Sequence, residues 1–262
     1  MHTALTIAGS DSSGGAGIQA DLKTFAAHRV YGTSAITAVT AQSTLGVTAW
    51  DAISADLVTA QIEAVEGDIG IDAVKTGMLA NAAIVEAVSA AIESLDLGNV
   101  VVDPVMVAKG GDRLLDIEAV GAIKAELLKH ATIVTPNIPE AEVLAEMAIK
   151  NLEDMRTAGR RILGLGPRVV VVKGGHLKGS ESIDLVLGSA GEFELRGARL
   201  PGRHTHGTGC TFAAAIAANL ALGHSVEQAL RSAREYLEGA IRHAPGIGRG
   251  QGPLNHFWRL YS

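Results

Sequence analysis

Residues 4–17 read ALTIAGSDSSGGAG, an apolar run of strand length that passes directly into a polar loop rich in glycine. Over residues 17–27 the apolar side chains recur three and four positions apart, which is typical of a helix. An apolar strand that turns through a glycine-rich loop into a helix is the first half of a β-α-β unit. The stretch therefore predicts an α/β fold if the same alternation recurs along the chain.

The alternation recurs. The expected strands are apolar almost throughout, as in a mostly parallel sheet that helices cover on both faces. These strands are Ala4–Ala8, Ser34–Ala38, Ala73–Thr76, Val100–Asp103, Thr132–Thr135 and Val169–Lys173. The expected helices are Gly17–Ala27, Ala55–Glu66, Ala80–Ser94, Ile117–Leu128, Glu140–Ala148, Leu152–Leu163, Thr211–Leu222 and Val226–His243. Two runs, Ser182–Leu187 and Glu192–Arg196, flank a short glycine-containing turn and predict an antiparallel edge hairpin.

Composition and charge limit the class of protein. Of 262 residues, 47% are hydrophobic and 19% charged, which provides enough apolar surface to offset the entropy of folding. No linker, charge block or repeat marks a boundary, so we expect one domain over residues 1–262. The net charge is -6 and no dense basic run is present, so the sequence argues against a nucleic-acid partner.

Targeting signals are also missing from the sequence. The first apolar run ends at Gly9, too early for a signal peptide, and no basic residues precede it. The most apolar later stretch, Phe212–Leu222, is too short to span a bilayer. The single cysteine, Cys210, cannot form an internal disulfide. We therefore expect a cytoplasmic protein with no membrane partner.

Polar residues at the ends of the expected strands are the first candidates for function, because open α/β sheets bind ligands beyond the carboxyl ends of their strands. The loop from Gly9 to Gly14 has the GxxxxG spacing of a phosphate loop, but Gly15 stands where that motif requires lysine. The GxGxxG spacing of a dinucleotide turn is absent as well. By itself the loop predicts only a tight strand-to-helix turn near a ligand.

A second glycine-rich segment, HGTGC at residues 206–210, precedes a strongly helix-forming run. Its first turn contains no carboxylate, so the free amides and the positive end of the helix dipole can receive an anion. The alternative is an ordinary glycine-rich connection of an α/β fold.

Four charged residues have two interpretations each. Asp103 and Glu140 stand at or just beyond strand ends, where they could share a magnesium ion directly or through water, or simply cap a helix or turn. Lys173 could face a nucleotide phosphate or be solvated. Asp21 in the first expected helix could take part in the site or be an ordinary solvated charge, since most helical aspartates lie at the surface.

Taken in order, these segments resemble the hydroxymethylpyrimidine and hydroxymethylpyrimidine-phosphate kinases of thiamine biosynthesis, in the ribokinase-like superfamily. The resemblance implies a ribokinase-like three-layer fold. The matching segments are residues 5–11, 14–23, 40–42, 75–79, 103–106, 135–137 with 140–141, 173–176, 206–211 and 252–257.

The resemblance implies two successive ATP-dependent phosphorylations. The first is on the hydroxymethyl oxygen of 4-amino-5-hydroxymethyl-2-methylpyrimidine, and the second is on the resulting monophosphate. Similar enzymes phosphorylate pyridoxal-type substrates, so a B6 salvage kinase is the nearest alternative. A non-catalytic pyrimidine-binding module is the alternative from another class, but it gives no reason for a phosphate cradle, a magnesium site and a base to occur together.

The resemblance also assigns residues to sites. ATP is expected across Asn137, Lys173 and the Gly207-Thr208-Gly209 cradle, with Mg²⁺ near Asp103 and Glu140. An aminopyrimidine edge combines a donor with an acceptor, and the Gln42 amide can meet both. The expected pyrimidine pocket consists of Gly9, Asp21, Gln42, Met78 and Val105.

Cys210 occupies the position at which many ribokinase-like relatives carry a catalytic aspartate, so the resemblance implies that it is the base. A lone cysteine is usually a small buried filler, but the predicted helix N-terminus around it favours a lowered pKa of the thiol. A bound triphosphate opposes that ionisation. The resemblance further implies a homodimer. The adjacent glycines of residues 108–113 suggest a flap that closes over the site, and the alternative is a disordered connection with no gating role.

Overall fold

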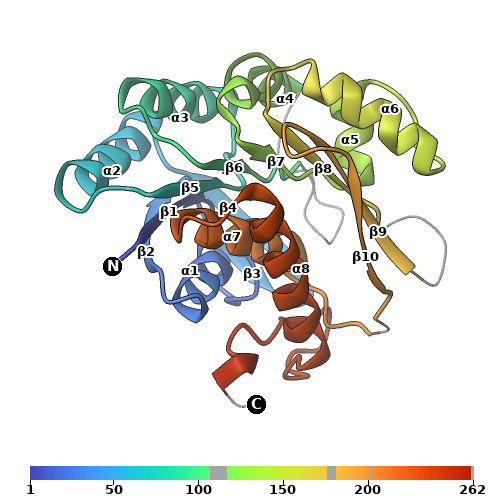
Figure 1. Ribbon diagram of the computed structural model, residues 1–262. Coiled ribbons are helices and arrows are strands. Elements are labelled where there is room, and N and C mark those ends of the chain that lie inside the picture. Colours follow the sequence, from blue (N-terminus) through green and yellow to red (C-terminus); the bar gives the residue numbers. More distant parts are fainter. Residues whose placement is uncertain (107–116, 176–180, 201, 261–262) are drawn as a thin grey trace.

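The structure is a computed structural model that describes residues 1–106, 117–175, 181–200 and 202–260. Its centre is an eight-stranded sheet in the order β10-β9-β8-β7-β6-β5-β1-β2 (Figure 1). The first six strands of this sheet along the chain pair in parallel, whereas β9 is antiparallel to both neighbours. The strands are β1 Thr3–Ala8, β2 Tyr31–Ile36, β5 Ala73–Thr76, β6 Val100–Val102, β7 Ile133–Val134, β8 Val169–Lys173, β9 Glu181–Gly188 and β10 Phe193–Ala198.

Helices cover both faces of this sheet (Figure 1). One face packs against α1 Gly17–Ala27, α7 Thr208–Ala221 and α8 Val226–Arg242. The other packs against α2 Ala55–Asp68, α3 Ala82–Ser94, α4 Ile117–Ala122, α5 Ile138–Ala145 and α6 Leu152–Leu163. A π-helical turn η1, Ile123–Leu127, and a 3₁₀ turn η2, Leu128–His130, continue α4, and a further 3₁₀ turn η3 covers Trp258–Leu260. The predicted three-layer α/β fold with an antiparallel edge hairpin is confirmed.

Strand β8 shows why the strands are apolar throughout. Successive side chains of a strand point to opposite faces, and both faces of this sheet are covered. Val169 and Val171 therefore enter the core beneath α7 and α8, while Val170 and Val172 enter the core beneath α5 and α6. All four valines are fully buried.

A separate two-stranded sheet, β3 Ala38–Ser43 and β4 Gly46–Ala52, was not predicted. The expected strand Ser34–Ala38 is split at Thr37, where the chain leaves the main sheet. The Thr37 amide donates to the Ala8 carbonyl and its hydroxyl donates to the Met78 carbonyl at 2.6 Å. Strand β3 then lies along the first glycine-rich loop, since Ser10 donates its amide to the Ala38 carbonyl.

Helix α7 is the most deeply buried helix among the described residues. Every residue from Thr211 to Ala221 is buried, and six of these eleven are alanine. The helix packs against the sheet and against α1 and α8. A helix that is apolar on all sides belongs in a core. Small side chains let its backbone approach the sheet closely, with the helix N-terminus at the carboxyl ends of β6 and β8.

The described residues contain no helix that is both long enough and apolar enough to cross a membrane.

Candidate active site

The start of α7 faces the carboxyl ends of β6 and β8. A Cβ atom added at Gly209 would lie 3.3 Å from Asp103 Oδ2 and 3.4 Å from Lys173 Nζ. No side chain caps this helix, and no acidic residue stands in its first turn. The first-turn amides lack intrahelical acceptors, so they and the helix dipole form a site for an anion.

Asp103 and Lys173 form a buried ion pair beneath that helix start. Lys173 Nζ lies 2.9 Å from Asp103 Oδ1, which also accepts a hydrogen bond from the Thr135 hydroxyl at 3.1 Å. Burial alone would lower the pKa of Lys173, but the Asp103 and Glu140 carboxylates outweigh it and raise the pKa above its usual value. The ammonium thus stays charged at the position where a phosphate would meet the helix. The interpretation of Lys173 as a solvated lysine is wrong.

Glu140 is part of the N-terminal cap of α5. The Asn137 side chain accepts from the Glu140 amide at 2.9 Å, and the Asn137 amide donates to Glu140 Oε2 at 2.8 Å. This reciprocal pair is a capping box, and it starts the helix at Ile138 rather than at the expected Glu140. Burial raises the pKa of Glu140 to about 7, with Lys173 opposing the shift and Asp103 adding to it.

The residues Asp103 and Glu140 fit a magnesium ion. Mg²⁺ in phosphate-transferring sites takes one or two carboxylates and completes its shell with water and phosphate oxygens. Asp103 Oδ2 faces the helix start, and the two carboxylates are close enough for Asp103 to raise the pKa of Glu140. The described residues hold no cluster of three or more His, Cys, Asp or Glu side chains that would form an all-protein cage.

Asp21 is a fully buried partner of Lys75. Its Oδ2 lies 2.7 Å from Lys75 Nζ and accepts from the Thr6 hydroxyl at 2.6 Å, and both charged side chains are inaccessible to solvent. The interpretation of Asp21 as a surface charge is therefore wrong. Its carboxylate has no surface that a pyrimidine could reach in this conformation, so the expected direct contact does not follow from this geometry.

Cys210 lies half-buried at the point where the N-termini of α1 and α7 meet. The amide of Gly17, the first residue of α1, lies close enough to the thiol to lower its pKa. Burial raises the pKa of the Cys210 thiol to about 11, although the Lys75 ammonium and the Gly17 amide lower it. The lowered pKa expected from the helix N-terminus alone is thus not found, because burial and nearby carboxylates outweigh the amides.

The remaining pocket candidates lie along the first loop and the ends of β5 and β6. Gly9 donates its amide to the Met78 carbonyl at 3.2 Å, and a Cβ added at Gly9 would lie 3.2 Å from Met78 Sδ. Gln42 is joined to the loop through Ser12, whose hydroxyl exchanges hydrogen bonds with the Gln42 backbone at 2.7 Å. Val105, two residues beyond Asp103, packs against the same apolar core as Met78.

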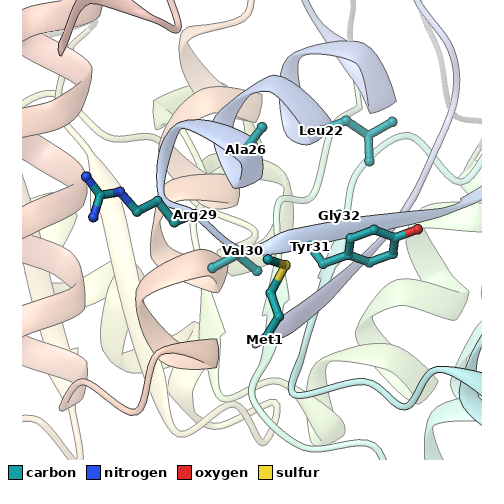
Figure 2. A pocket seen from close by; sticks show the side chains of 7 residues that line it. All are labelled: Met1, Leu22, Ala26, Arg29, Val30, Tyr31 and Gly32. Atoms are coloured by element: carbon teal, nitrogen blue, oxygen red, sulfur yellow. The ribbon is translucent and has the colours of Figure 1, made fainter. Parts of the chain in front are cut away.

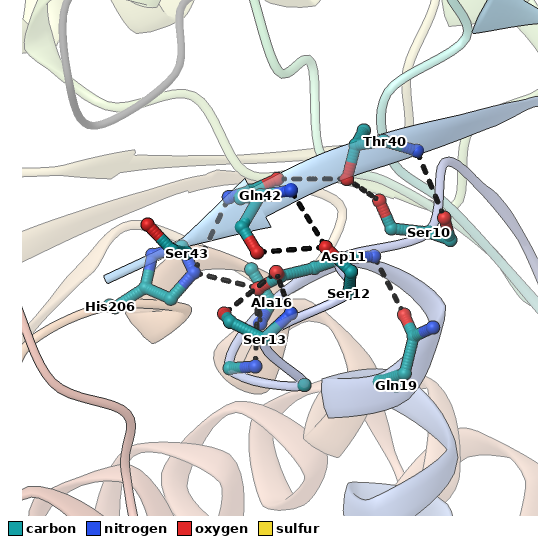
Figure 3. Close-up of polar contacts among 12 residues, drawn as sticks. Ser10, Asp11, Ser12, Ser13, Ala16, Gln19, Thr40, Gln42, Ser43 and His206 are labelled. Carbon is teal, nitrogen blue, oxygen red and sulfur yellow. Dashed lines mark hydrogen bonds and ion pairs between the residues drawn. The ribbon is translucent and has the colours of Figure 1, made fainter. Parts of the chain in front are cut away.

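The first loop, residues 9–17, binds the carboxylate of its own residue Asp11. Asp11 is 1% exposed, and its carboxylate accepts the amides of Gly15 and Ala16 at 3.1 and 2.8 Å together with His206 Nε2 at 2.7 Å (Figure 3). Burial would raise the pKa of Asp11, but the hydrogen bonds from His206 and from the Ser13 hydroxyl and amide lower it to about 2. Several of the loop amides are therefore committed to a carboxylate, which explains why the sequence departs from a phosphate loop here.

A hollow elsewhere on the surface lies away from this constellation. Its lining includes Met1, Arg29 and Tyr31, at the amino ends of β1 and β2, and Figure 2 shows the Arg29 and Tyr31 side chains pointing apart. Ligands of parallel sheets bind at the opposite ends of the strands. We therefore place the site at the strand ends that α7 faces.

Comparison with known proteins decides the family. Residues 11–255 match the family model described as phosphomethylpyrimidine kinase. The chain belongs to the phosphomethylpyrimidine kinase family. It is 49% identical over 259 residues to the hydroxymethylpyrimidine/phosphomethylpyrimidine kinase of Synechococcus elongatus, covering 98% of each chain.

Solved structures agree with this family and with the ribokinase-like fold. The phosphomethylpyrimidine kinase of Clostridium difficile 630 is 43% identical with a TM-score of 0.83, covering 92% of this chain and 100% of that one. An ADP complex of a Bacillus subtilis pyridoxal kinase is 38% identical with a TM-score of 0.92, and the match covers both chains fully.

The structure adds three buried residues, Lys75, Asp11 and His206, that the sequence analysis did not assign to the kinase site. Lys75 is a charged residue inside an otherwise apolar strand, a signal that was readable. Asp11 and His206 are separated by 195 residues in the sequence, and nothing in either glycine-rich segment predicts that the two side chains are in contact. The proposed flap at residues 108–113 lies outside the described residues, as does His176, the last residue of the matching segment 173–176.

The ionisation of Cys210 can be measured directly, because it is the only cysteine. With a pKa of about 11, the alkylation rate with iodoacetamide should still be rising at about pH 9, since the thiolate is the nucleophile. Mass spectrometry after timed labelling measures this rate, and Cys210→Ala should take up no label. A rate that levels off by about pH 8 would instead support the lowered pKa expected from the helix N-terminus.

Proposed function

We propose that this kinase transfers the γ-phosphoryl group of ATP to 4-amino-5-hydroxymethyl-2-methylpyrimidine and then to its monophosphate, in the cytoplasm. The observation that carries the proposal is the uncapped start of α7, which faces the Asp103–Lys173 pair. Phosphoryl transfer requires mainly alignment and neutralisation of charge, and this arrangement provides both.

ATP binds across Asn137, Lys173 and the α7 start. The Lys173 amide donates to the Pro136 carbonyl at 2.8 Å, so the ends of β7 and β8 are held together beneath the nucleotide. Lys173 supplies a fixed positive charge, and the amides of residues 207–210 receive the transferring phosphoryl group. Gly209 has no side chain between these amides and the Asp103–Lys173 pair, so phosphate oxygens can approach both.

The pyrimidine binds between the first loop and β3. The Gln42 amide meets the donor and acceptor of the aminopyrimidine edge, Met78 and Val105 contact the ring faces, and Gly9 leaves room for the ring. Asp21 does not contact the pyrimidine directly. It holds the fully buried Lys75 in place beneath the pocket through their ion pair. The substrate hydroxyl then points towards Cys210.

Cys210 accepts the hydroxyl proton as the substrate oxygen attacks the γ-phosphorus. The bond from this phosphorus to the bridging oxygen of ADP breaks as the new bond forms. Because burial raises the pKa of the thiol to about 11, thiolate formation depends on the groups that favour it. Those groups are the Lys75 ammonium and the Gly17 amide, and both are present before substrate binds.

A magnesium ion would be held by Asp103 and Glu140. When bound, the ion neutralises charge on the phosphates and orients them. Lys173 keeps Asp103 in place at 2.9 Å, and the Asn137 amide orients the Glu140 carboxylate.

A pyridoxal kinase activity is the second candidate. It is favoured by the close structural likeness to the Bacillus subtilis pyridoxal kinase, at a TM-score of 0.92. Both substrates present a hydroxymethyl group on a six-membered nitrogen heterocycle, so one site can orient either. Gln42 distinguishes them, because the aminopyrimidine offers it an amino donor beside a ring-nitrogen acceptor, whereas pyridoxal carries no amino group.

The function is tested by ADP release with the pyrimidine, its monophosphate and pyridoxal. We expect the highest kcat/KM with the two pyrimidines. Gln42→Ala should raise KM for the pyrimidine, whereas Cys210→Ala should lower kcat by about 10²–10⁴-fold with little change in KM. Preference for pyridoxal would favour the second candidate, and no ADP release with any of the three would indicate a binding module.

The magnesium assignment predicts that Asp103→Asn combined with Glu140→Gln weakens the metal-dependent gain in nucleotide affinity. Calorimetry with ATP, with and without Mg²⁺, should show a gain in the parent protein that falls by about tenfold or more in the double variant. Glu142→Gln, on the same helix, serves as a matched control. An unchanged gain would remove both carboxylates from the metal site.

We also propose a homodimer that covers the β3–β4 sheet. Two-stranded sheets are only marginally stable alone. Val39 and Trp50 in this sheet are 51% and 40% exposed, and Leu45 in the turn between its strands is 71% exposed, so the sheet presents an apolar surface. Light scattering should give twice the 27.0 kDa of the chain. Val39→Asp should shift the mass towards the monomer, and a monomeric parent protein would refute the proposal.

A further inference from the structure

The carboxylate of Asp11 is the acceptor around which the first loop folds. Its Oδ1 accepts the Ser13 amide at 2.8 Å and the Ser13 hydroxyl at 2.7 Å. Its Oδ2 accepts the Gly15 and Ala16 amides and His206 Nε2 (Figure 3). Five donors therefore converge on one buried side chain, and four of them belong to the turn that leads into α1.

The fifth donor, His206, links that turn to α7. His206 directly precedes Gly207, the residue before the first turn of α7. Gly207 has a φ of +82°, and a Cβ there would lie 1.8 Å from the Gly15 carbonyl oxygen. The start of α7 thus rests on the same loop that Asp11 holds, and only glycine fits the contact.

The two helix starts meet at Cys210. Helices α1 and α7 pack against one another, and Cys210 lies in the first turn of α7. On the α1 side, the Gly17 amide lies close enough to lower the pKa of its thiol. Gly17 itself is fixed: it has a φ of +55°, and a Cβ there would lie 2.4 Å from the Gly9 carbonyl oxygen. The relative position of α1 and α7 therefore determines where the thiol and the α7 amides point.

We propose that Asp11 and His206 are positioning residues for phosphoryl transfer, which hold the N-termini of α1 and α7 together and so fix Cys210 and the α7 amides. This inference rests on the kinase function proposed above. Neither side chain touches the reacting atoms; they act through the helix starts. Small displacements matter here, since a misplacement of about 1 Å can lower a rate by about 10²-fold.

A different role for His206 would run through Gln42, whose Nε2 lies 3.4 Å from His206 Nε2. Ionised Asp11 only accepts hydrogen bonds, so His206 Nε2 must carry the proton at 2.7 Å from Asp11. The same nitrogen then has no lone pair for the Gln42 amide. We therefore assign the link to Asp11, and the two roles predict different kinetics.

The test compares His206→Gln with His206→Asn. A glutamine amide reaches about as far as imidazole Nε2 and can donate to Asp11, whereas the asparagine amide is one bond too short. We expect His206→Asn to lower kcat for the pyrimidine by about 100-fold with KM within about threefold, and His206→Gln to restore most of kcat. Equal kcat in the two variants, or a change confined to KM, would overturn the proposal.

A second measurement does not depend on turnover. Loosening the junction exposes the thiol, so iodoacetamide should alkylate Cys210 about fivefold faster in His206→Asn than in His206→Gln or the parent protein. An unchanged alkylation rate would refute the positioning role even if the parent protein had no kinase activity. If the parent protein did not phosphorylate the pyrimidine, that result would refute the proposed function but not the positioning role of Asp11 and His206.

Two further variants complete the design. The double variant Asp11→Asn with His206→Asn should have a kcat no lower than that of the slower single variant, because both substitutions remove the same Asp11–His206 contact. Reductions in kcat that add up in the double variant would refute this contact as the shared cause. If His206→Asn fails to fold, Asp11→Asn alone is compared with the parent protein by the same two measurements. Asp72→Asn removes a carboxylate that accepts the Thr3 amide at the opposite ends of the strands, and it should leave kcat and the alkylation rate unchanged.

Discussion

The close packing of α7 on the central sheet is the constraint on which the site depends. Its alanine-rich, fully buried body can approach the strands because it presents almost no side-chain bulk, and its direction is then set by the strands it covers. The helix N-terminus arrives where the parallel strands end. Anion-binding amides, the Asp103–Lys173 pair and Cys210 come together there as a consequence of packing, before any ligand contributes to their arrangement.

The buried charged side chains beneath the site form ion pairs. Lys75 meets Asp21, and Lys173 meets Asp103, each within 2.9 Å and largely shielded from water. Isolated buried charges are costly, whereas paired ones can be held in place and can still act on a third group. Lys75 illustrates this: it is neutralised locally by Asp21, yet it still lowers the pKa of the Cys210 thiol. Such fixed charges can favour a transition state without reorganising during the reaction.

The sequence was sufficient to predict the main sheet and most of the helices. Buried parallel strands are contiguous apolar runs, and a run such as Val169–Lys173 strongly favours a buried strand. It was insufficient for β3 and β4. In β3, buried Ala38 and Thr40 alternate with exposed residues but are not both apolar, and most of β4 is exposed, so neither strand shows an apolar pattern in the sequence. Strand ends correctly indicated Asp103 and Lys173. The Asp11–His206 contact could not be predicted, since it depends on how two distant segments pack, and the pKa of Cys210 depends on burial that spacing does not reveal.

The long sequence separation of the Asp11–His206 contact has a consequence for the order in which the chain can assemble. During synthesis, the first loop is made early, but the donor that joins it to α7 comes 195 residues later. The His206 amide in turn donates to the Gly252 carbonyl, and Thr211 contacts His256 at 3.0 Å, so the junction also depends on the segment that contains Gly252 and His256. Contacts so distant in sequence form late and slow folding. A nascent chain can therefore complete most of its sheet while its catalytic edge is still open, and the anion site closes only after the segment around His256 has been made.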